Sequence, residues 1–239
     1  MLSQPNVLII GASGGIGTAL VSAIQQRLPA AQIQATWHSQ KPSMISSNLH
    51  WHQLDASNED QFSSLADQLP SLDWIINAAG VLHTPEKGPE KTIKKFGTDF
   101  FMHNIAVNSL PTLLAAKHCG HLLKQSQQGI FAAISARVGS ISDNNLGGWI
   151  SYRSSKAALN MALKTLAIEW HRSMKNVCVA ALHPGTTDTM LSKPFQANVP
   201  ADKLFPTQQT ADYLLKIIAN LKPQESGCFM GWDEKPIPW

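Results

Sequence analysis

A glycine-rich turn stands between a short apolar run, Asn6–Ile10, and a stretch with helical periodicity, Ile16–Arg27. The turn reads Gly11-Ala-Ser-Gly-Gly-Ile-Gly17, and the order strand, glycine turn, helix is typical of a phosphate-binding loop. Gly11 allows a tight turn, Gly15 lets a pyrophosphate approach the backbone, and Gly17 lets the helix pack close to the sheet. The positive end of the helix dipole then faces the anion. The alternative is an ordinary strand-to-helix turn with surplus glycines.

Apolar runs of strand length alternate with helical patterns along the 239 residues, which predicts right-handed βαβ units and a parallel sheet. The predicted strands are Asn6–Ile10, Gln32–Trp37, Leu49–Gln53, Trp74–Asn77, Gly129–Ser135, Val177–Leu182 and Gly227–Met230. The predicted helices are Ile16–Arg27, Gln61–Gln68, Phe100–Gln125, Ser151–Met174 and Thr207–Asn220. The fold class is therefore α/β, with one domain over 1–239 and a doubly wound parallel sheet of about seven strands flanked by helices on both faces. Prolines without sustained periodicity predict two substrate loops, around 83–98 and 190–206.

Charge and cysteine content exclude several classes of protein. Nineteen Lys and Arg against sixteen Asp and Glu give a net charge of +3, and the one short basic cluster lacks aromatics, so no nucleic-acid binding is expected. No apolar run approaches the roughly 20 residues of a membrane span. The nine histidines show no metal-ligand spacing, and Cys119, Cys178 and Cys228 form no CxxC pair, so neither a metal site nor a disulfide framework is expected. A protein of the reducing cytoplasm fits best.

Two further strand ends carry candidate nucleotide contacts. Asn77-Ala-Ala-Gly80 places three small residues after the fourth predicted strand, where the backbone can lie flat against a planar ligand. Asp55 follows the third predicted strand and has two interpretations. It accepts a hydrogen bond from an adenine amino group, or it caps the helix that follows.

Tyr152 and Lys156 stand near the start of the long helix predicted over 151–174. Their spacing puts the phenol and the ammonium on one face, a turn apart. A nearby ammonium, together with the charge of an oxidised nicotinamide, lowers the pKa of a tyrosine from its ordinary value of about 10. The tyrosine then becomes a usable acid and base near neutral pH. By itself this spacing is common on amphipathic helices, so its value comes from its surroundings.

Taken together, these residues resemble the short-chain dehydrogenase/reductase superfamily, and Ser135–Ile141 with Gly147–Asn160 is similar to its C-factor/sniffer-type carbonyl reductases. The resemblance covers almost the whole chain and implies a single NAD(P)-binding Rossmann domain. The cofactor-binding residues that it implies are Gly11, Ser13, Gly14, Gly15, Ile16, Gly17, His38, Ser39, Asp55, Asn77, Ala78, Ala79, Gly80, Tyr152, Lys156, Pro184, Gly185, Thr187 and Thr189. The catalytic residues that it implies are Asn108, Ser135, Tyr152 and Lys156.

The resemblance also implies a mechanism, hydride transfer between a nicotinamide and a carbonyl or alcohol carbon. Tyr152 exchanges the proton, and Lys156 binds the nicotinamide ribose and depresses the pKa of the tyrosine. Asn108 holds a water that links the lysine to solvent, while a serine orients the substrate oxygen. Thr187 and Thr189 are placed to meet the carboxamide and the pyrophosphate.

Three positions depart from the family pattern. Ile10 replaces the threonine that usually precedes the first glycine, which removes a hydroxyl that can brace the turn. The usual serine position falls on Ala136, which leaves Ser135 and Ser140 as candidates. We choose Ser135 because it ends the fifth predicted strand. The end of the second predicted strand has no acid and carries His38 where an arginine is common, so NADP is favoured and NAD stays possible.

The expected function is therefore that of an NADP-preferring oxidoreductase acting on a small carbonyl or alcohol. Trp149 and Trp232 are candidates for the substrate pocket, whereas His183 is expected to pack at a strand end. A hydrophobic substrate is indicated by the apolar loop residues Met190, Leu191, Phe195, Leu204 and Phe205. The rival is a dinucleotide-binding regulatory or signalling protein of C-factor type with little turnover. Retention of Tyr152 and Lys156 favours the enzyme. The resemblance further implies a homodimer or homotetramer, assembled through the two longest predicted helices.

Overall fold

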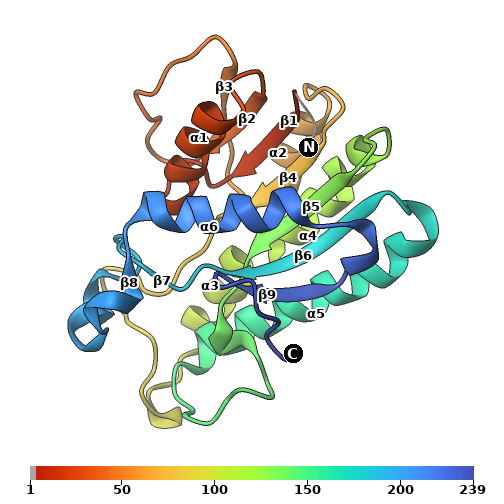
Figure 1. Ribbon diagram of the computed structural model, residues 1–239. Helices are drawn as coiled ribbons and strands as arrows, with labels where there is room; N and C mark the ends of the chain where they lie inside the picture. The colour runs from red at the N-terminus through yellow and green to blue at the C-terminus, as the bar shows by residue number, and fades with distance from the viewer. Residues whose placement is uncertain (1–3) are drawn as a thin grey trace.

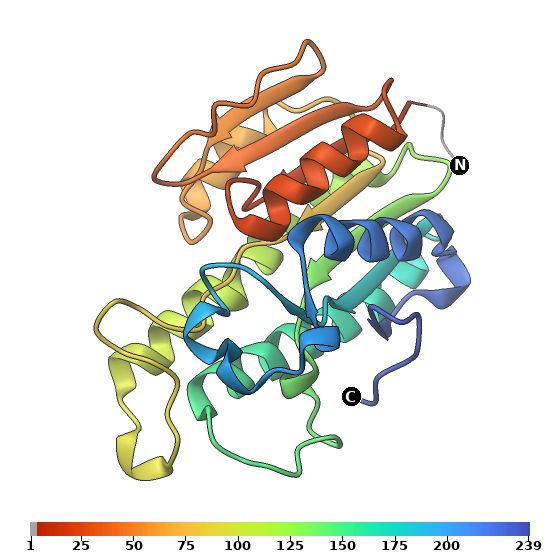
Figure 2. The same ribbon diagram turned by 60° about the vertical axis from the view of Figure 1, so that its left-hand side comes forward.

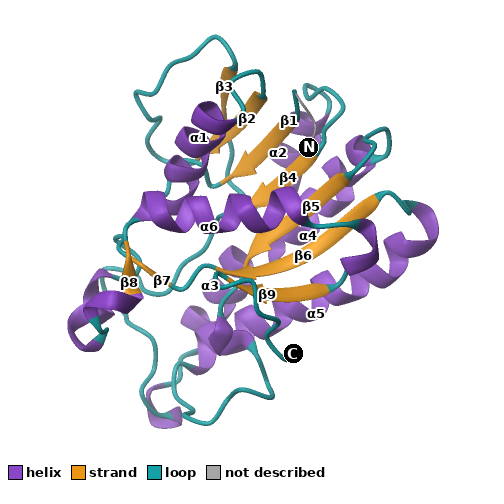
Figure 3. Cartoon of the chain, viewed as in Figure 1, coloured by secondary structure: helices purple, strands orange, loops and turns teal. Residues whose placement is uncertain are grey.

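The central feature of the computed structural model, which describes residues 4–239, is a sheet of seven parallel strands (Figures 1 and 3). Its strands are β1 (Asn6–Ile10), β2 (Gln32–Trp37), β3 (Leu49–Gln53), β4 (Trp74–Asn77), β5 (Gly129–Ile134), β6 (Val177–His183) and β9 (Cys228–Gly231). They lie in the order β3-β2-β1-β4-β5-β6-β9, with every pair parallel. The strand order reverses between β1 and β4. In such sheets ligands bind at the carboxyl ends of the strands beside that reversal.

Helices cover both faces of the sheet, as Figures 1 and 2 show. They are α1 (Gly15–Arg27), α2 (Glu59–Ala66), α3 (Thr98–Asn108), α4 (Leu110–Cys119), α5 (Ile150–Ser173) and α6 (Thr207–Asn220). Helices α1 and α6 pack on one face, while α2, α4 and α5 pack on the other. The predicted single-domain, doubly wound Rossmann fold is confirmed. Within residues 4–239, none of the helices combines the length and the apolar character that a membrane crossing requires.

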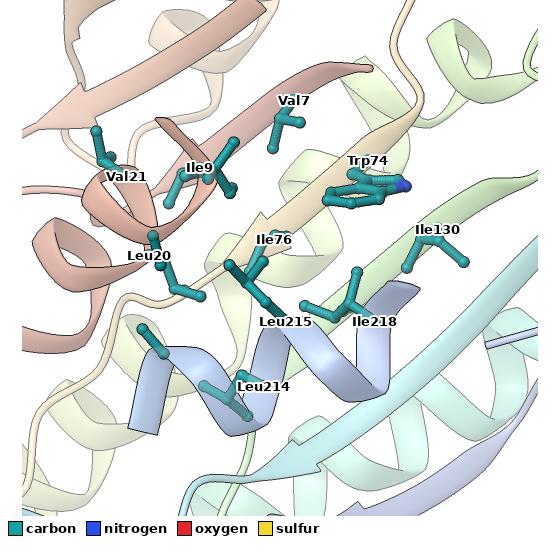
Figure 4. Packing of buried hydrophobic residues seen from close by; sticks show 14 of the residues in the cluster. Val7, Ile9, Leu20, Val21, Trp74, Ile76, Ile130, Leu214, Leu215 and Ile218 are labelled. Atoms are coloured by element: carbon teal, nitrogen blue, oxygen red, sulfur yellow. The ribbon is translucent and has the colours of Figure 1, made fainter. Parts of the chain in front are cut away.

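Alternate residues of β1 supply two hydrophobic cores. Val7 and Ile9 face α1 and α6, where Leu20 and Leu214 lie over the sheet (Figure 4). Leu8 and Ile10 face the opposite helices. A strand buried on both faces needs a continuous apolar run rather than alternation, which is why the strands could be located in the sequence. Complete burial of one such side chain stabilises the folded state by about 1.5–3 kcal/mol relative to leaving it exposed.

The predicted helix Phe100–Gln125 is wrong as a single element. The chain forms α3, then α4, then a short 3-10 turn over Gly120–Leu123. Pro111 stands in the first turn of α4, where a missing N–H costs nothing, whereas inside a continuous helix its ring would clash with the preceding turn. The break also lets the Ser109 hydroxyl donate a 2.7 Å hydrogen bond to the Ser155 carbonyl oxygen of α5.

The other predicted boundaries match the structure or differ from it by one or two residues, but the two predicted loops contain more structure than expected. Short 3-10 turns occur at Ile93–Lys95 in the first, and at Lys193–Asn198 and Ala201–Lys203 in the second. The second loop also ends in a strand, β8 (Leu204–Phe205), which pairs with β7 (Thr186–Thr187). Both loops lie at the carboxyl end of the sheet, on the same side as the segment that precedes α5 (Figures 1 and 2).

Candidate active site

The glycine turn after β1 has no room for side chains at two of its glycines. Gly11 has a φ of +74°, and a Cβ there would lie 2.7 Å from the Ala79 backbone nitrogen. A Cβ on Gly17 would lie 2.2 Å from the Gly11 carbonyl oxygen. Helix α1 begins at Gly15, and no side chain caps its first turn. The turn therefore presents helical backbone N–H groups that no capping side chain occupies, as a pyrophosphate site requires.

Thr36 on β2 supplies the brace whose loss the sequence predicts at Ile10. Its hydroxyl oxygen accepts a 3.0 Å hydrogen bond from the Gly11 backbone N–H. Thr36 is 2% exposed, so this bond is shielded from water. A hydroxyl from the neighbouring strand thus serves the turn, and only the pairing of β1 with β2 reveals it.

Asp55 lies beside the glycine turn and does not cap α2. Its carboxylate accepts hydrogen bonds from the Ser57 backbone N–H (2.9 Å) and hydroxyl (2.7 Å), and these bonds hold the pKa of Asp55 below its usual value. The cap is Asn58, whose side-chain oxygen accepts from the Gln61 N–H. Of the two interpretations of Asp55, the N-cap is wrong. A small cavity of about 150 Å³ contains Asp55 together with Gly11, Ser13, His38 and Ala79 in its wall.

Tyr152 and Lys156 lie on the first turns of α5 and are 8% and 3% exposed. The Lys156 Nζ lies 5.9 Å from the centre of the Tyr152 ring and donates a 2.9 Å hydrogen bond to the Ile134 carbonyl oxygen at the end of β5. Burial lowers the pKa of Lys156 to about 8 and raises the pKa of Tyr152 above its ordinary value. In the polypeptide alone, burial thus outweighs the effect of the lysine that the sequence predicts. The phenol keeps its proton, which is the form that a proton donor needs.

Asn108 ends α3 and joins three elements of the site. Its side-chain oxygen accepts from the Val81 N–H (2.7 Å), and its amide nitrogen donates to the Val81 carbonyl oxygen (2.9 Å) and to the Ser155 hydroxyl of α5 (2.9 Å). A Cβ on Gly80 would lie 3.1 Å from the Asn108 side-chain oxygen and 3.5 Å from the Lys156 Nζ. Both polar groups therefore crowd the backbone that follows β4.

The Asn77 side chain joins the end of β4 to the backbone that follows it and to α4. It is buried, accepts from the Ala79 N–H (3.0 Å) and donates to the Thr112 hydroxyl of α4 (2.7 Å). These bonds hold Ala78 and Ala79 in place, and both alanines, with Gly80, line the cavity that contains Tyr152.

The two candidate serines next to Ala136 lie in different surroundings. Ser135 lines the same cavity as Ala136 and Tyr152, but its hydroxyl donates to the Asn160 side-chain oxygen at 2.5 Å. The Ser140 hydroxyl donates to the Pro238 carbonyl oxygen at 2.6 Å. Position favours Ser135, as the sequence predicts, although its proton points toward α5.

The segment after β6 closes the site from the other side. Gly185 has a φ of +75°, and Thr187 is buried with its hydroxyl 2.9 Å from that of Thr210 on α6. A Cβ on Gly15 would lie 2.7 Å from the Thr189 methyl group, so Thr189 reaches the glycine turn. Pro184, Gly185, Thr187 and Thr189 all line the cavity with Tyr152 and Lys156.

The cavity has a volume of about 260 Å³, and much of its wall is apolar. Trp149 and the second predicted loop contribute to it as expected. Its apolar residues include Ile16, Leu82, Val138, Trp149, Leu191 and Phe195. The other candidates lie elsewhere. Trp232 packs on Phe205 with ring centres 4.6 Å apart, and Met190 is 82% exposed.

Comparison with known proteins assigns the family, because residues 5–200 match the short chain dehydrogenases. The chain is a short-chain dehydrogenase. A dehydrogenase of Rhodococcus sp. (strain AD45), 1-hydroxy-2-glutathionyl-2-methyl-3-butene dehydrogenase, is 28% identical over 98% of this chain and 99% of that protein. The C-signal of Myxococcus xanthus is 31% identical over 117 residues, 49% of this chain and 65% of that protein.

Two solved structures share the fold of this short-chain dehydrogenase. The carbonyl reductase Sniffer of D. melanogaster superposes with a TM-score of 0.86 at 23% identity, covering 99% of this chain and 100% of that one. The NADPH-bound carbonyl reductase from chicken fatty liver superposes with a TM-score of 0.87 at 23% identity, covering 100% of this chain and 96% of that one. The similarity to C-factor/sniffer-type reductases is confirmed. The protein is thus an NAD(P)-dependent oxidoreductase that transfers hydride.

One residue of this short-chain dehydrogenase that sequence reasoning missed is Glu90, in the first loop. It is 3% exposed, and its carboxylate accepts from the Ser151 backbone N–H (3.2 Å) and from the Ser151 hydroxyl. Its carbonyl oxygen accepts from the Trp149 N–H at 2.5 Å, and Trp149 has the left-handed φ of 53° that bulky residues rarely adopt. Glu90 therefore caps the helix that carries Tyr152 and Lys156. One of two acids in a basic, proline-containing loop, Glu90 gave no sequence signal for this role.

Proposed function

We propose that the enzyme reduces small hydrophobic carbonyl compounds, or oxidises the corresponding alcohols, with NADP as the preferred cofactor. The observation that carries this proposal is that Tyr152 and Lys156 share one partly apolar cavity with Ala78, Ala79 and Pro184. The site fits a dinucleotide, because the first turn of α1 has no side-chain cap and the small residues Ala78, Ala79 and Gly80 line the cavity. The test is NADPH oxidation with a panel of aldehydes and ketones.

Each polar residue has one role in this proposal. When bound, the nicotinamide supplies or accepts the hydride. Tyr152 donates its proton to the substrate oxygen during reduction and takes it back during oxidation. Lys156 binds the nicotinamide ribose, and its charge stabilises the phenolate that remains. Asn108 holds the water that returns a proton to the lysine, and Ser135 is the serine that the resemblance places beside the substrate oxygen, with its proton donated to Asn160.

The size of the cavity and the two loops support a substrate of modest size. Loop 190–206 supplies Leu191 and Phe195 to the wall of the cavity, and His83 of loop 83–98 packs against Phe195 with ring centres 5.9 Å apart. An apolar body fits against these side chains, with its carbonyl group directed at Tyr152. The cytoplasm is the proposed compartment, since Cys119, Cys178 and Cys228 are free thiols.

We expect NADPH to bind about tenfold more tightly than NADH, the effect of one hydrogen bond to a charged group. His38 lies exposed at the end of β2, with the Ser39 hydroxyl 3.2 Å from its Nδ1. No acid follows β2 to repel a 2′-phosphate. Fluorescence titration with both cofactors measures the preference. His38→Asp should reverse it, and tighter NADH binding by the unaltered protein would contradict the assignment.

We expect a homodimer or homotetramer assembled through α3, α4 and α5. These helices expose the large apolar side chains Met102, Leu113, Met161 and Ile168. Monomeric soluble proteins rarely expose extended apolar surface, and an isologous interface would cover it. Light scattering at assay concentration measures the mass. A monomer refutes this prediction, and Met161→Lys should dissociate the oligomer if the interface lies here.

A second candidate is a dinucleotide-binding regulatory protein with little turnover. It is favoured by the similarity to C-signal and by the alanine at the usual serine position. The same carbonyl panel separates the two candidates. NADPH binding without oxidation for any substrate would support the regulatory protein.

A further inference from the structure

The site offers no free serine proton to a substrate oxygen. Position 136 is alanine, the Ser135 hydroxyl donates to Asn160, and the Ser140 hydroxyl donates to the Pro238 carbonyl oxygen. A hydroxyl has one proton to give. A substrate carbonyl oxygen accepts hydrogen bonds and does not donate them. A donor other than serine would therefore complete the site beside Tyr152.

His183 and Arg137 are the titratable side chains of this cavity that the proposed mechanism leaves unused, and Arg137 is already paired with Asp143. His183 ends β6 and lines the cavity together with Tyr152 and Ala136. Side chains alternate along a strand, and Val179 and Ala181 face α5, so the imidazole lies on the α5 side of the sheet. The Ser135 N–H bonds to the Leu182 carbonyl oxygen, which makes His183 the lateral neighbour of Ser135.

Buried polar atoms without hydrogen-bond partners lie near Ser135 and His183. Among the residues the structure describes, three buried side-chain atoms have no hydrogen-bond partner: Asn160 Nδ2, His183 Nδ1 and Asp233 Oδ1. Asn160 contacts Ser135, His183 pairs with Gly231 of β9, and a Cβ on Gly231 would lie 2.6 Å from the Asp233 Oδ1. Native interiors hold few such atoms, and a concentration of them calls for a functional explanation.

The protonation state of His183 suits a hydrogen-bond donor. Burial lowers its pKa to about 4, Arg137 acts in the same direction, and Asp233 acts against them. The ring is therefore neutral near pH 7 and carries one N–H. Nδ1 is closed off from solvent, and a buried N–H without an acceptor is rarer than a buried acceptor without a donor. We assign the proton on this ground to Nε2, the other nitrogen of a ring that lines the cavity.

We propose that His183 is a further catalytic residue, which donates its Nε2–H to the substrate oxygen in place of the absent serine. This rests on the proposed carbonyl reduction. The imidazole forms a hydrogen bond and transfers no proton, since the proton comes from Tyr152. A neutral imidazole can polarise a carbonyl group in this way. Asn160 and Ser135 then form the wall behind the donor.

The test compares His183→Met with His183→Gln, because the two side chains have similar length and flexibility and only glutamine keeps an N–H. The readouts are kcat and KM for the best carbonyl substrate, NADPH affinity by fluorescence titration, and the melting temperature. We expect His183→Met to lower kcat on the order of a hundredfold, with NADPH affinity within about threefold. His183→Gln should keep about tenfold more activity than His183→Met. His171→Ala, at an exposed position near the end of α5, is the control.

The decisive variant adds the missing hydroxyl. Ala136→Ser in the His183→Met background should restore kcat about tenfold or more, which a purely structural role of the histidine would not allow. If His183→Met fails to fold, His183→Ala with added imidazole replaces it, and recovery of turnover is the expected result.

Two outcomes overturn the proposal. One is equal turnover by the Met and Gln variants. The other is a large loss in Ser135→Ala beside an unaffected His183→Met, which would return the role to the serine. In both cases the unaltered enzyme still reduces carbonyls through Tyr152, so the proposed function survives. An unaltered enzyme that turns over no carbonyl overturns both.

Discussion

Tyr152→Phe should abolish carbonyl reduction while leaving NADPH affinity within about twofold of the unaltered protein. The phenylalanine ring keeps the packing of a side chain that is only 8% exposed, and only the proton donor is lost. General acid catalysis contributes a factor of about a hundred to ten thousand, so the loss in kcat should reach at least a hundredfold. Stopped-flow NADPH oxidation measures the rate, and fluorescence titration measures the affinity.

The chain offers a matched control, because its only other tyrosine is Tyr213 on α6. Tyr213→Phe removes a hydroxyl that accepts from Gln209 and should leave turnover unchanged. Lys156→Ala should weaken both turnover and NADPH binding, since the ammonium lies between the phenol and the end of β5. Normal turnover by Tyr152→Phe would move the acid and base role to another group and remove the basis of the proposed mechanism.

Gly17→Ala should destroy NADPH binding and destabilise the fold together. The added methyl group would lie 2.2 Å from the Gly11 carbonyl oxygen and 2.7 Å from the Ala12 Cα, and both contacts are with backbone. No rotamer relieves such contacts, so the glycine turn must shift away from α1. Overpacking of this kind costs about 1–3 kcal/mol, more than the gain of about 1 kcal/mol that alanine brings to a helix. We expect NADPH affinity to fall at least tenfold and the melting temperature to drop by several degrees.

Gly88→Ala is the control for this prediction, because a Cβ there has no neighbour within 4 Å. It should leave both the melting temperature and the affinity unchanged. Thermal unfolding measures the melting temperature of both variants, and titration with NADPH measures their affinity. If Gly17→Ala bound NADPH normally, close packing at the turn could not be the reason for the glycine at position 17.

Most of the fold could be predicted because its information is local. A strand buried on both faces needs an apolar run such as Val7–Ile10, and the motif residues follow such runs directly. The helix break at Pro111 was missed because apolar periodicity continues across it, although a proline inside a predicted helix is itself a warning. The pairing of β7 with β8 joins two-residue segments far apart in the chain, which no periodicity can reveal.

The site was predicted less completely, since several of its contacts exist only in the folded chain. Spacing on one helix brings Tyr152 and Lys156 together, so the sequence indicates them. Thr36 reaches Gly11 through the pairing of two strands, and Glu90 reaches Ser151 from a loop 61 residues earlier in the chain. Such residues have ordinary neighbours in the sequence. His183 was expected to pack at a strand end, and the missing hydrogen-bond partner of its buried Nδ1 appears only once the surroundings are built.

The Glu90 cap ties the first loop to helix α5, so the two segments keep a fixed position relative to each other. Exchange of this loop between related reductases is an obvious route to altered substrate range, yet a donor loop without an acid at position 90 would leave the first turn of α5 uncapped. A donor loop with a different backbone path there would also lose the hydrogen bond from the Trp149 N–H. A chimaera would then lose rate as well as change selectivity. A loop exchange should therefore transfer the loop together with Trp149 and Ser151.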